Sequence, residues 1–265
     1  MRSQVRFLLA PPVAARAYSI HIELGGSQWM DRFLDVDKYG YEICPESNLV
    51  NADLSWAKLQ NANLARANLS NANLSFADLS GADLSGTDLS GANLFQAKLW
   101  RTNLTDSNLT DANLVGAILI KAKLICAKLH QADLTDANLT SANLANADLS
   151  NSIIRNARLA RTNLQNADLI HADLTGSTLA NAKLQNASLE FAILQNTDLT
   201  NAEFKGAILD EADLRGTSLS RARIGTEDDE LEDDQDEFDA DQDESGDESE
   251  VMYIEKIWSE RLPEK

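Results

Sequence analysis

The chain has 265 residues, 43% of them hydrophobic and only 6% aromatic, and its formal net charge at pH 7 is −19. No segment has about 20 consecutive apolar residues, so the sequence predicts no membrane-spanning helix. Two cysteines, Cys44 and Cys126, are too few for a disulfide framework, which makes a reducing compartment the expectation.

The N-terminal flank, residues 1–46, precedes any regular pattern. Residues 1–17 resemble a signal peptide, but their apolar stretch is short and is interrupted by Pro11 and Pro12. A cytoplasmic protein is therefore expected, with export to the periplasm or thylakoid lumen as the alternative. Residues 18–24 alternate as a strand does, and apolar residues between 29 and 34 have helical spacing. We expect this flank to cap the next region.

From Leu49 to Ile224 an apolar residue occupies every fifth position, 36 times in succession, and 33 of these residues are Leu. Neither a helix nor a strand places every fifth residue on one face, so neither element could bury the whole set. The chain must turn between successive Leu residues. We therefore expect a solenoid, in which stacked coils bring the Leu side chains to a common axis.

The other positions of the five-residue unit support this interpretation. The residue two before the Leu is Ala in 27 of 36 units and Ser or Thr in the rest, which predicts a second inward column of small side chains. The residue two after the Leu is Asn, Gly or Asp 21 times. These residues tolerate a left-handed backbone best, so this position predicts the corner. The residues just before and just after the Leu should face solvent.

Runs such as Ala62-Asn63-Leu64 and Ala82-Asp83-Leu84, repeated every five residues, resemble the A(D/N)LXX signature of the pentapeptide-repeat family, and long cyanobacterial members in particular. The resemblance covers residues 47–226. It implies an all-β fold, a right-handed quadrilateral β-helix with 20 residues per coil. The repeat region would then make about nine coils, stacked about 4.8 Å apart.

The negative charge is concentrated after the repeats. Residues 227–250 contain 16 acidic residues and no basic one, whereas the repeat region contains 15 basic and 17 acidic residues. Sorted by the four sides that the resemblance implies, the outward positions of the Leu49 side carry −6 and those of the opposite Leu59 side carry +5. The pattern predicts one acidic and one basic side, although random drift of solvated positions explains it as well.

Large apolar residues cluster within two coils at positions that the pattern leaves to solvent. Such a cluster predicts a protein-binding patch, and the alternative is that these side chains cover one another or hold the N-terminal flank. The predicted patch consists of Phe95, Trp100, Val115, Ile118, Ile120 and Ile125.

The C-terminal flank has two parts. Residues 227–250 are predicted to form an acidic, disordered linker, because a run of like charges cannot bury a core. Residues 251–265 are predicted to form an amphipathic helix, which either caps the last coil, the slightly favoured interpretation, or docks in a groove of a partner. Its apolar face consists of Val251, Ile254, Ile257, Trp258 and Leu262.

No residue pattern supports catalysis. The histidines His21, His130 and His171 lack metal-ligand spacing, so no catalytic, cofactor-binding or metal site is expected. The favoured function is a non-enzymatic scaffold that binds an unidentified protein, without direct nucleic-acid binding, with a possible homodimer through one end of the rod. The alternative, which family resemblance supplies, is a DNA-mimicking binder of DNA gyrase. That branch implies a broadly acidic rod, and this repeat region is close to neutral.

Overall fold

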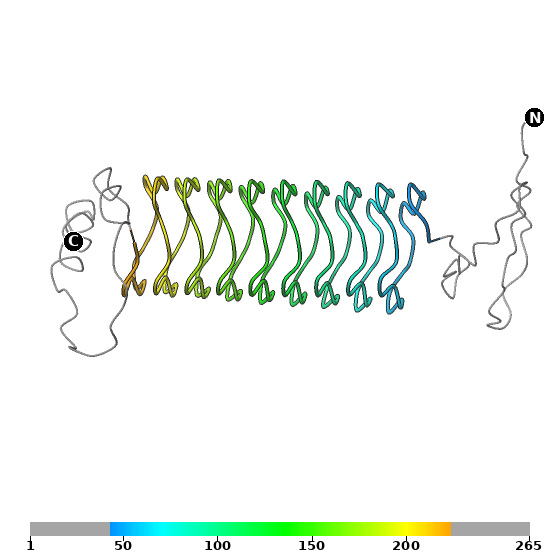
Figure 1. The fold of residues 1–265 in the computed structure, drawn as a ribbon, viewed down its shortest axis with the longest axis horizontal. Coiled ribbons are helices and arrows are strands. Elements are labelled where there is room, and N and C mark those ends of the chain that lie inside the picture. Colours follow the sequence, from blue (N-terminus) through cyan, green and yellow to red (C-terminus); the bar gives the residue numbers. More distant parts are fainter. Residues whose placement is uncertain (1–42, 224–265) are drawn as a thin grey trace, which may run out of the picture.

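The computed structural model describes residues 43–223, which form a rod of coils stacked along one axis (Figure 1). Within this range there is no helix, and the β-structure consists of single bridge residues rather than longer strands. The first of these residues is Asn48 and the last is Arg223. Every bridge is parallel and joins residues 20 apart, as Asn48 and Asn68 are, so each coil contains 20 residues, as the family resemblance implies.

Backbone hydrogen bonds hold each coil to the next. On the Leu49 side the amide of Leu49 donates to the carbonyl of Asn68 at 2.7 Å, and the amide of Asn68 donates back to the carbonyl of Ser47 at 2.9 Å. The corners of adjacent coils are hydrogen-bonded as well, because the amide of Asn51 donates to the carbonyl of Ser70 at 3.0 Å. The same pattern recurs on all four sides, so adjacent coils satisfy one another's buried backbone groups.

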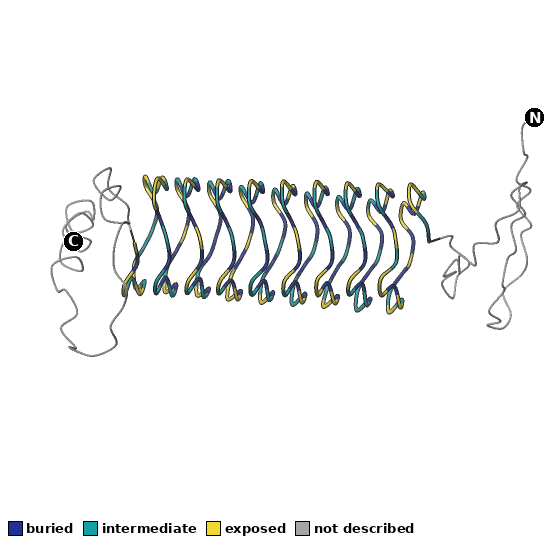
Figure 2. Ribbon diagram, viewed as in Figure 1, coloured by how far each residue is buried: buried dark blue, intermediate teal, exposed yellow. Residues whose placement is uncertain are grey.

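The predicted inward columns form the core. Every Leu of the repeat from Leu49 to Leu199 is buried, and so are Ile154 and Phe204, while outward residues other than Asp173 are exposed or half-buried (Figure 2). Most of the Ala column is buried beside them. Where Thr replaces Ala, its hydroxyl donates to a core carbonyl, as Thr102 does to Leu79 at 2.8 Å. This bond offsets the cost of burying the hydroxyl.

The corners confirm the predicted left-handed backbone. The residue two after the Leu has a positive φ in every unit from Asn51 to Arg221. The residue just before the Leu has a role that the sequence did not reveal, because its side chain accepts a hydrogen bond from the corner backbone. The amide of Ser80, for example, donates to Oδ1 of Asp78 at 3.1 Å. The preference for Asn or Asp at this position therefore has a structural cause, beyond exposure to solvent.

The two ends of the described rod differ. The leucines of the first coil are buried, and Ile43 is buried beside them. In the last coil, by contrast, Leu209, Leu214 and Leu219 are only partly buried. Residues 1–17, which resemble a signal peptide, the rest of the expected N-terminal cap up to residue 42, the expected acidic linker and C-terminal helix, and Ile224 lie outside the described residues. No helix long and apolar enough to cross a membrane occurs between residues 43 and 223.

Candidate interaction surfaces

Three aromatic side chains follow one corner of the rod, where the Leu54 side meets the Leu59 side. Trp56 and Phe76 occupy the same left-handed position in successive coils, and their rings stack with centroids 4.2 Å apart. The rings of Phe95 and Phe76 pack edge to face, with centroids 5.4 Å apart. Trp56 is 65% exposed although it is stacked. We call these three residues the aromatic corner, and it presents an unusually large apolar edge to solvent.

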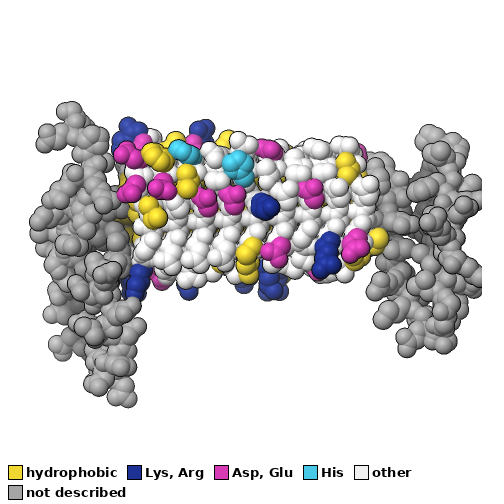
Figure 3. Space-filling view, turned by 90° about the horizontal axis from the view of Figure 1, so that it is seen from above, with side chains coloured by type: hydrophobic (Ala, Val, Ile, Leu, Met, Phe, Trp, Pro, Cys, Tyr) yellow, Lys and Arg dark blue, Asp and Glu magenta, His cyan; other side chains and the backbone are white. Residues whose placement is uncertain are grey.

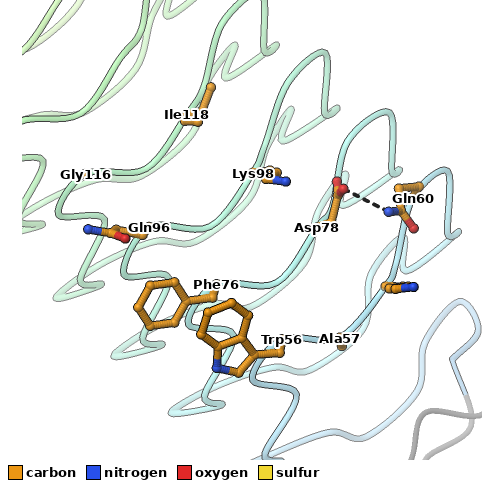
Figure 4. A pocket seen from close by; sticks show the side chains of 10 residues that line it. Trp56, Ala57, Gln60, Phe76, Asp78, Gln96, Lys98, Gly116 and Ile118 are labelled. Carbon is orange, nitrogen blue, oxygen red and sulfur yellow. Dashed lines mark hydrogen bonds between the residues drawn. The ribbon is translucent and has the colours of Figure 1, made fainter.

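A shallow hollow of about 410 Å³ lies beside the aromatic corner, on the Leu59 side (Figure 4). Its floor is polar, since the amide of Gln60 donates to Asp78 at 2.8 Å. Burial alone would raise the pKa of Asp78, but hydrogen bonds from Ser80 and Gln60 and the nearby charge of Lys98 hold that pKa below its usual range. The hollow is lined by Trp56, Ala57, Lys58, Gln60, Phe76, Asp78, Gln96, Lys98, Gly116 and Ile118.

The structure places the predicted patch across several columns of the rod. Phe95 and Val115 follow each other in one column, because the amide of Gln96 donates to Val115 at 2.9 Å. Trp100 and Ile120 follow each other in the next column in the same way. Ile118 lies between these columns, on the Leu59 side. As predicted, residues 20 apart are stacked.

The six residues of the predicted patch differ in how far they are exposed to solvent. Trp100 is 43% exposed and Ile118 is 38% exposed, whereas the other four are half-buried. The guanidinium of Arg101 lies 4.3 Å from the Trp100 ring, so a cation covers part of that apolar surface. Ile125 belongs to the Leu64 side, beyond the corner at Lys121, and is therefore the member most separated from the hollow. Their role in binding stays a prediction.

A second apolar group near the C-terminal end of the rod was missed in the sequence. Phe191 is 50% exposed and stacks on His171 with centroids 4.9 Å apart, and Ile208 is 47% exposed. Both His171 and Phe191 occupy left-handed corners in successive coils. The sequence did contain a signal for this group, because Phe191 occupies the corner position, where Asn or Gly is usual. Acidic and apolar side chains gather together on this part of the surface (Figure 3).

The predicted charge asymmetry can now be placed on the rod. The bridge partners show that Asp148 and Asp168 are adjacent on the Leu49 side, with Lys128 as their basic neighbour. Lys98 and Ile118 are adjacent on the Leu59 side. The parallel 20-residue register therefore confirms the assignment of charged residues to columns. What these sides bind is a separate question.

The described residues offer little for metal binding or for a disulfide. Between residues 43 and 223 no group of three or more His, Cys, Asp or Glu residues is arranged to hold a metal ion. Cys126 is exposed, and Cys44 does not pair with it in a disulfide. The predicted C-terminal docking or capping face, from Val251 to Leu262, lies outside the described residues.

Taken together, the four sides, the parallel bridges and the leucine core define a right-handed quadrilateral β-helix, the fold of a repeat scaffold. The chain belongs to the pentapeptide-repeat family. It matches the family described as Pentapeptide repeats in overlapping stretches at residues 47–86, 87–124, 102–140, 118–156, 142–181, 152–190 and 182–221.

Solved structures of other members are similar to this chain. HetL from Nostoc sp. strain PCC 7120, a pentapeptide repeat protein involved in heterocyst differentiation regulation, is 33% identical over 68% of this chain and 86% of its own, with a TM-score of 0.39. Rfr23 from Cyanothece 51142 is 37% identical over 37% of this chain and 64% of its own, with a TM-score of 0.28.

The fold extends to a more distant protein. Trypsin-treated QnrB1, a plasmid-mediated fluoroquinolone resistance protein, is 19% identical over 69% of this chain and 91% of its own, with a TM-score of 0.63. At this identity the likeness concerns the fold alone. No curated protein is similar enough to the chain to count as a match.

Proposed function

We propose that this protein is a non-enzymatic, cytoplasmic scaffold whose rod binds a protein partner. The observation that carries the proposal is the apolar surface formed by the aromatic corner and the predicted patch, which share Phe95, together with the hollow beside them. A rod held together by its inner leucines gains nothing in its core from Trp56 or Trp100, which point outward and are 65% and 43% exposed. Exposed aromatic side chains that are fixed by their neighbours supply contact area at a low cost in conformational entropy.

The partner that fits this surface has an apolar side chain to cover Trp56 and polar groups for the hollow. Lys58 and Lys98 line the hollow and are exposed, so an acidic or carbonyl-rich segment suits it. The proposal does not extend to DNA gyrase, because the likeness to QnrB1 is one of fold and the repeat region, with 15 basic against 17 acidic residues, is close to neutral.

Affinity capture with the full chain tests the proposal. Replacement of Trp100 and Ile120 by Asp places two charges in the patch, and we expect the captured protein partners to disappear while the β-sheet circular dichroism stays unchanged. Ala160→Asp with Ala180→Asp is the matched control, because these residues occupy the same column, each three coils beyond its counterpart in the patch. Unchanged capture by the Trp100 and Ile120 variant would contradict the predicted patch, and unfolding would show that these side chains are structural.

A further inference from the structure

Four cations share one corner of the rod, where the Leu59 side meets the Leu64 side. Arg101, Lys121, Arg161 and Arg221 all occupy the left-handed position there, with φ between 55° and 59°. We call these four residues the basic ridge. Among the described corners Arg66 is the one other cation with a positive φ, and it lies on a different corner.

The fold does not require cations at this corner. Gly adopts a left-handed backbone at no steric cost and Asn at a low one, whereas other side chains are disfavoured by about 1 kcal/mol or more. In other coils the same corner is formed by Asn61, Gly81, Asn181 and Asn201. The cations of the basic ridge therefore stand where Asn or Gly would form the turn at a lower conformational cost. Arg101 also covers part of the Trp100 ring of its own coil. For Lys121, Arg161 and Arg221 the placement points to a role outside the coil itself.

Within residues 43–223, the basic ridge has no acidic partner. The ion pairs formed there join Arg66 to Glu46, Arg155 to Asp173 and Arg215 to Asp213, and none of them includes a ridge residue. Both sides that meet at the ridge are basic: the Leu59 side, which includes the ridge, carries +5, and the Leu64 side has five cations against three acidic residues. Those eight residues are Arg66, Lys123, Lys183, Lys205, Arg223, Asp83, Asp106 and Glu203.

The chain itself supplies a complementary segment. Residues 227–250 carry 16 acidic residues and no basic one. The described rod ends at Arg223, two residues beyond Arg221, so the chain leaves the rod beside the last member of the ridge. Arg101 lies six 20-residue coils before Arg221, which is about 29 Å at the usual strand spacing. A segment of this length can extend to about 80 Å, which exceeds that distance.

We propose that residues 227–250 fold back along the rod and dock on the basic ridge, with their carboxylates beside Arg221, Arg161, Lys121 and Arg101. The contact is intramolecular, so the segment acts at a high effective concentration and many weak ion pairs add up. The association is electrostatic and is therefore weakened by salt. Any other polyanion reaches the ridge by displacing this segment. The proposal does not rest on the partner surface at the aromatic corner, although Arg101 of the ridge covers part of Trp100 in the predicted patch.

Two native lysines test this contact in the full chain. Lys121 belongs to the ridge, whereas Lys128 lies on the acidic Leu49 side at nearly the same height along the rod, and both are exposed. A water-soluble carbodiimide joins a carboxylate to an amine only when the two are in contact. At low salt we expect peptides from residues 227–250 to be coupled to Lys121 about fivefold more often than to Lys128, or more, and high salt should remove the preference.

Substitutions on the ridge sharpen the test. Arg161→Gln with Arg221→Gln should lower the coupling of Lys121 to the level of Lys128, and Arg161→Gln alone should lower it partly. Arg66→Gln is the control, because Arg66 occupies a left-handed corner away from the ridge, and Gln is accepted at such corners at Gln96 and Gln131. Equal coupling of Lys121 and Lys128, or no coupling of either, overturns the proposal. An equal mixture of ¹⁵N-labelled and unlabelled protein reports contacts between chains, and a share of mixed-isotope products that approaches the statistical half also overturns it.

Discussion

At the scale of single residues, the Asn or Asp before each Leu has two tasks. Its Oδ1 accepts a hydrogen bond from the corner backbone, and in several columns its side chain also bonds the same position of the next coil, as Asn73 does to Asp53 at 3.1 Å. Asp173 is the extreme case. It is only 8% exposed, its bridge neighbours are Ile153 and Ile193, and Arg155 contacts it at 2.6 Å.

The environment of Asp173 favours its charged form. Burial alone would raise the pKa of Asp173, but hydrogen bonds from Thr175 and Arg155 and the charge of Arg155 more than offset that effect, so the pKa lies below its usual range. A carboxylate with a depressed folded pKa adds stability above its unfolded pKa of about 3.9, and this contribution is lost as the pH falls through the folded pKa.

We therefore expect Asp173→Asn to destabilise the rod by about 1 kcal/mol at pH 7, because the amide keeps the turn but loses the ion pair. The difference between the wild type and this variant should shrink below about pH 4 and vanish in stronger acid. Urea unfolding at several pH values measures it. Asp168→Asn, on the Leu49 side, is the control, since no ion pair to Asp168 forms among the described residues. A difference that persists unchanged in acid would contradict the role of the charge.

At the scale of the coil, the sequence predicts where the corners lie but not which corner side chains have a function. The sequence correctly predicted which residues turn, because Asn, Gly and Asp recur two residues after the Leu and tolerate a left-handed backbone. It did not predict which corners would carry functional side chains, since Trp56, Arg101 and Phe191 occupy this position as well as Asn. The contact between Arg101 and Trp100 depends on side-chain conformation, about which a periodic pattern says nothing.

Two glycine corners with the same backbone angle separate the cost of the left-handed turn from the cost of crowding. Gly86 and Gly91 both have φ of 63°. A Cβ at position 86 would meet Cγ of Arg66 at 3.4 Å, an ordinary contact, whereas a Cβ at position 91 would lie 2.5 Å from Oδ1 of Asn71. The side chain at position 91 would therefore force Asn71 to move.

We expect Gly86→Ala to cost about 1 kcal/mol, the steric penalty of a left-handed Ala. Gly91→Ala should cost measurably more, because displacement of Asn71 adds to the same penalty. Thermal unfolding followed by circular dichroism compares the two variants directly. Equal losses would show that Asn71 rotates away freely and that crowding along the corner contributes nothing.

At the scale of the whole molecule, a solenoid has no closed core, and its ends decide where it opens first. The leucines of the first coil are buried, but Leu209, Leu214 and Leu219 in the last coil are partly exposed. Their amides also lack backbone acceptors among residues 43–223, whereas each earlier coil donates to the next. The sequence predicted that both ends need cover, but the repeat pattern is identical at each end and could not show that they differ.

The apolar face of residues 251–265 is our candidate cover for the exposed end. If it packs on Leu209, Leu214 and Leu219, Trp258→Asp in the full chain removes apolar contact and places a charge at the end of the core. Hydrogen exchange at residues 205–223 should then become faster while exchange near residues 100–160 stays unchanged, since each coil depends chiefly on its neighbours. Ser259→Asp adds the same charge outside the predicted apolar face and serves as the control. Equal exchange in the wild type and both variants would show that Trp258 does not cover the rod, and that the last coil is left for a partner or for a second copy of the chain.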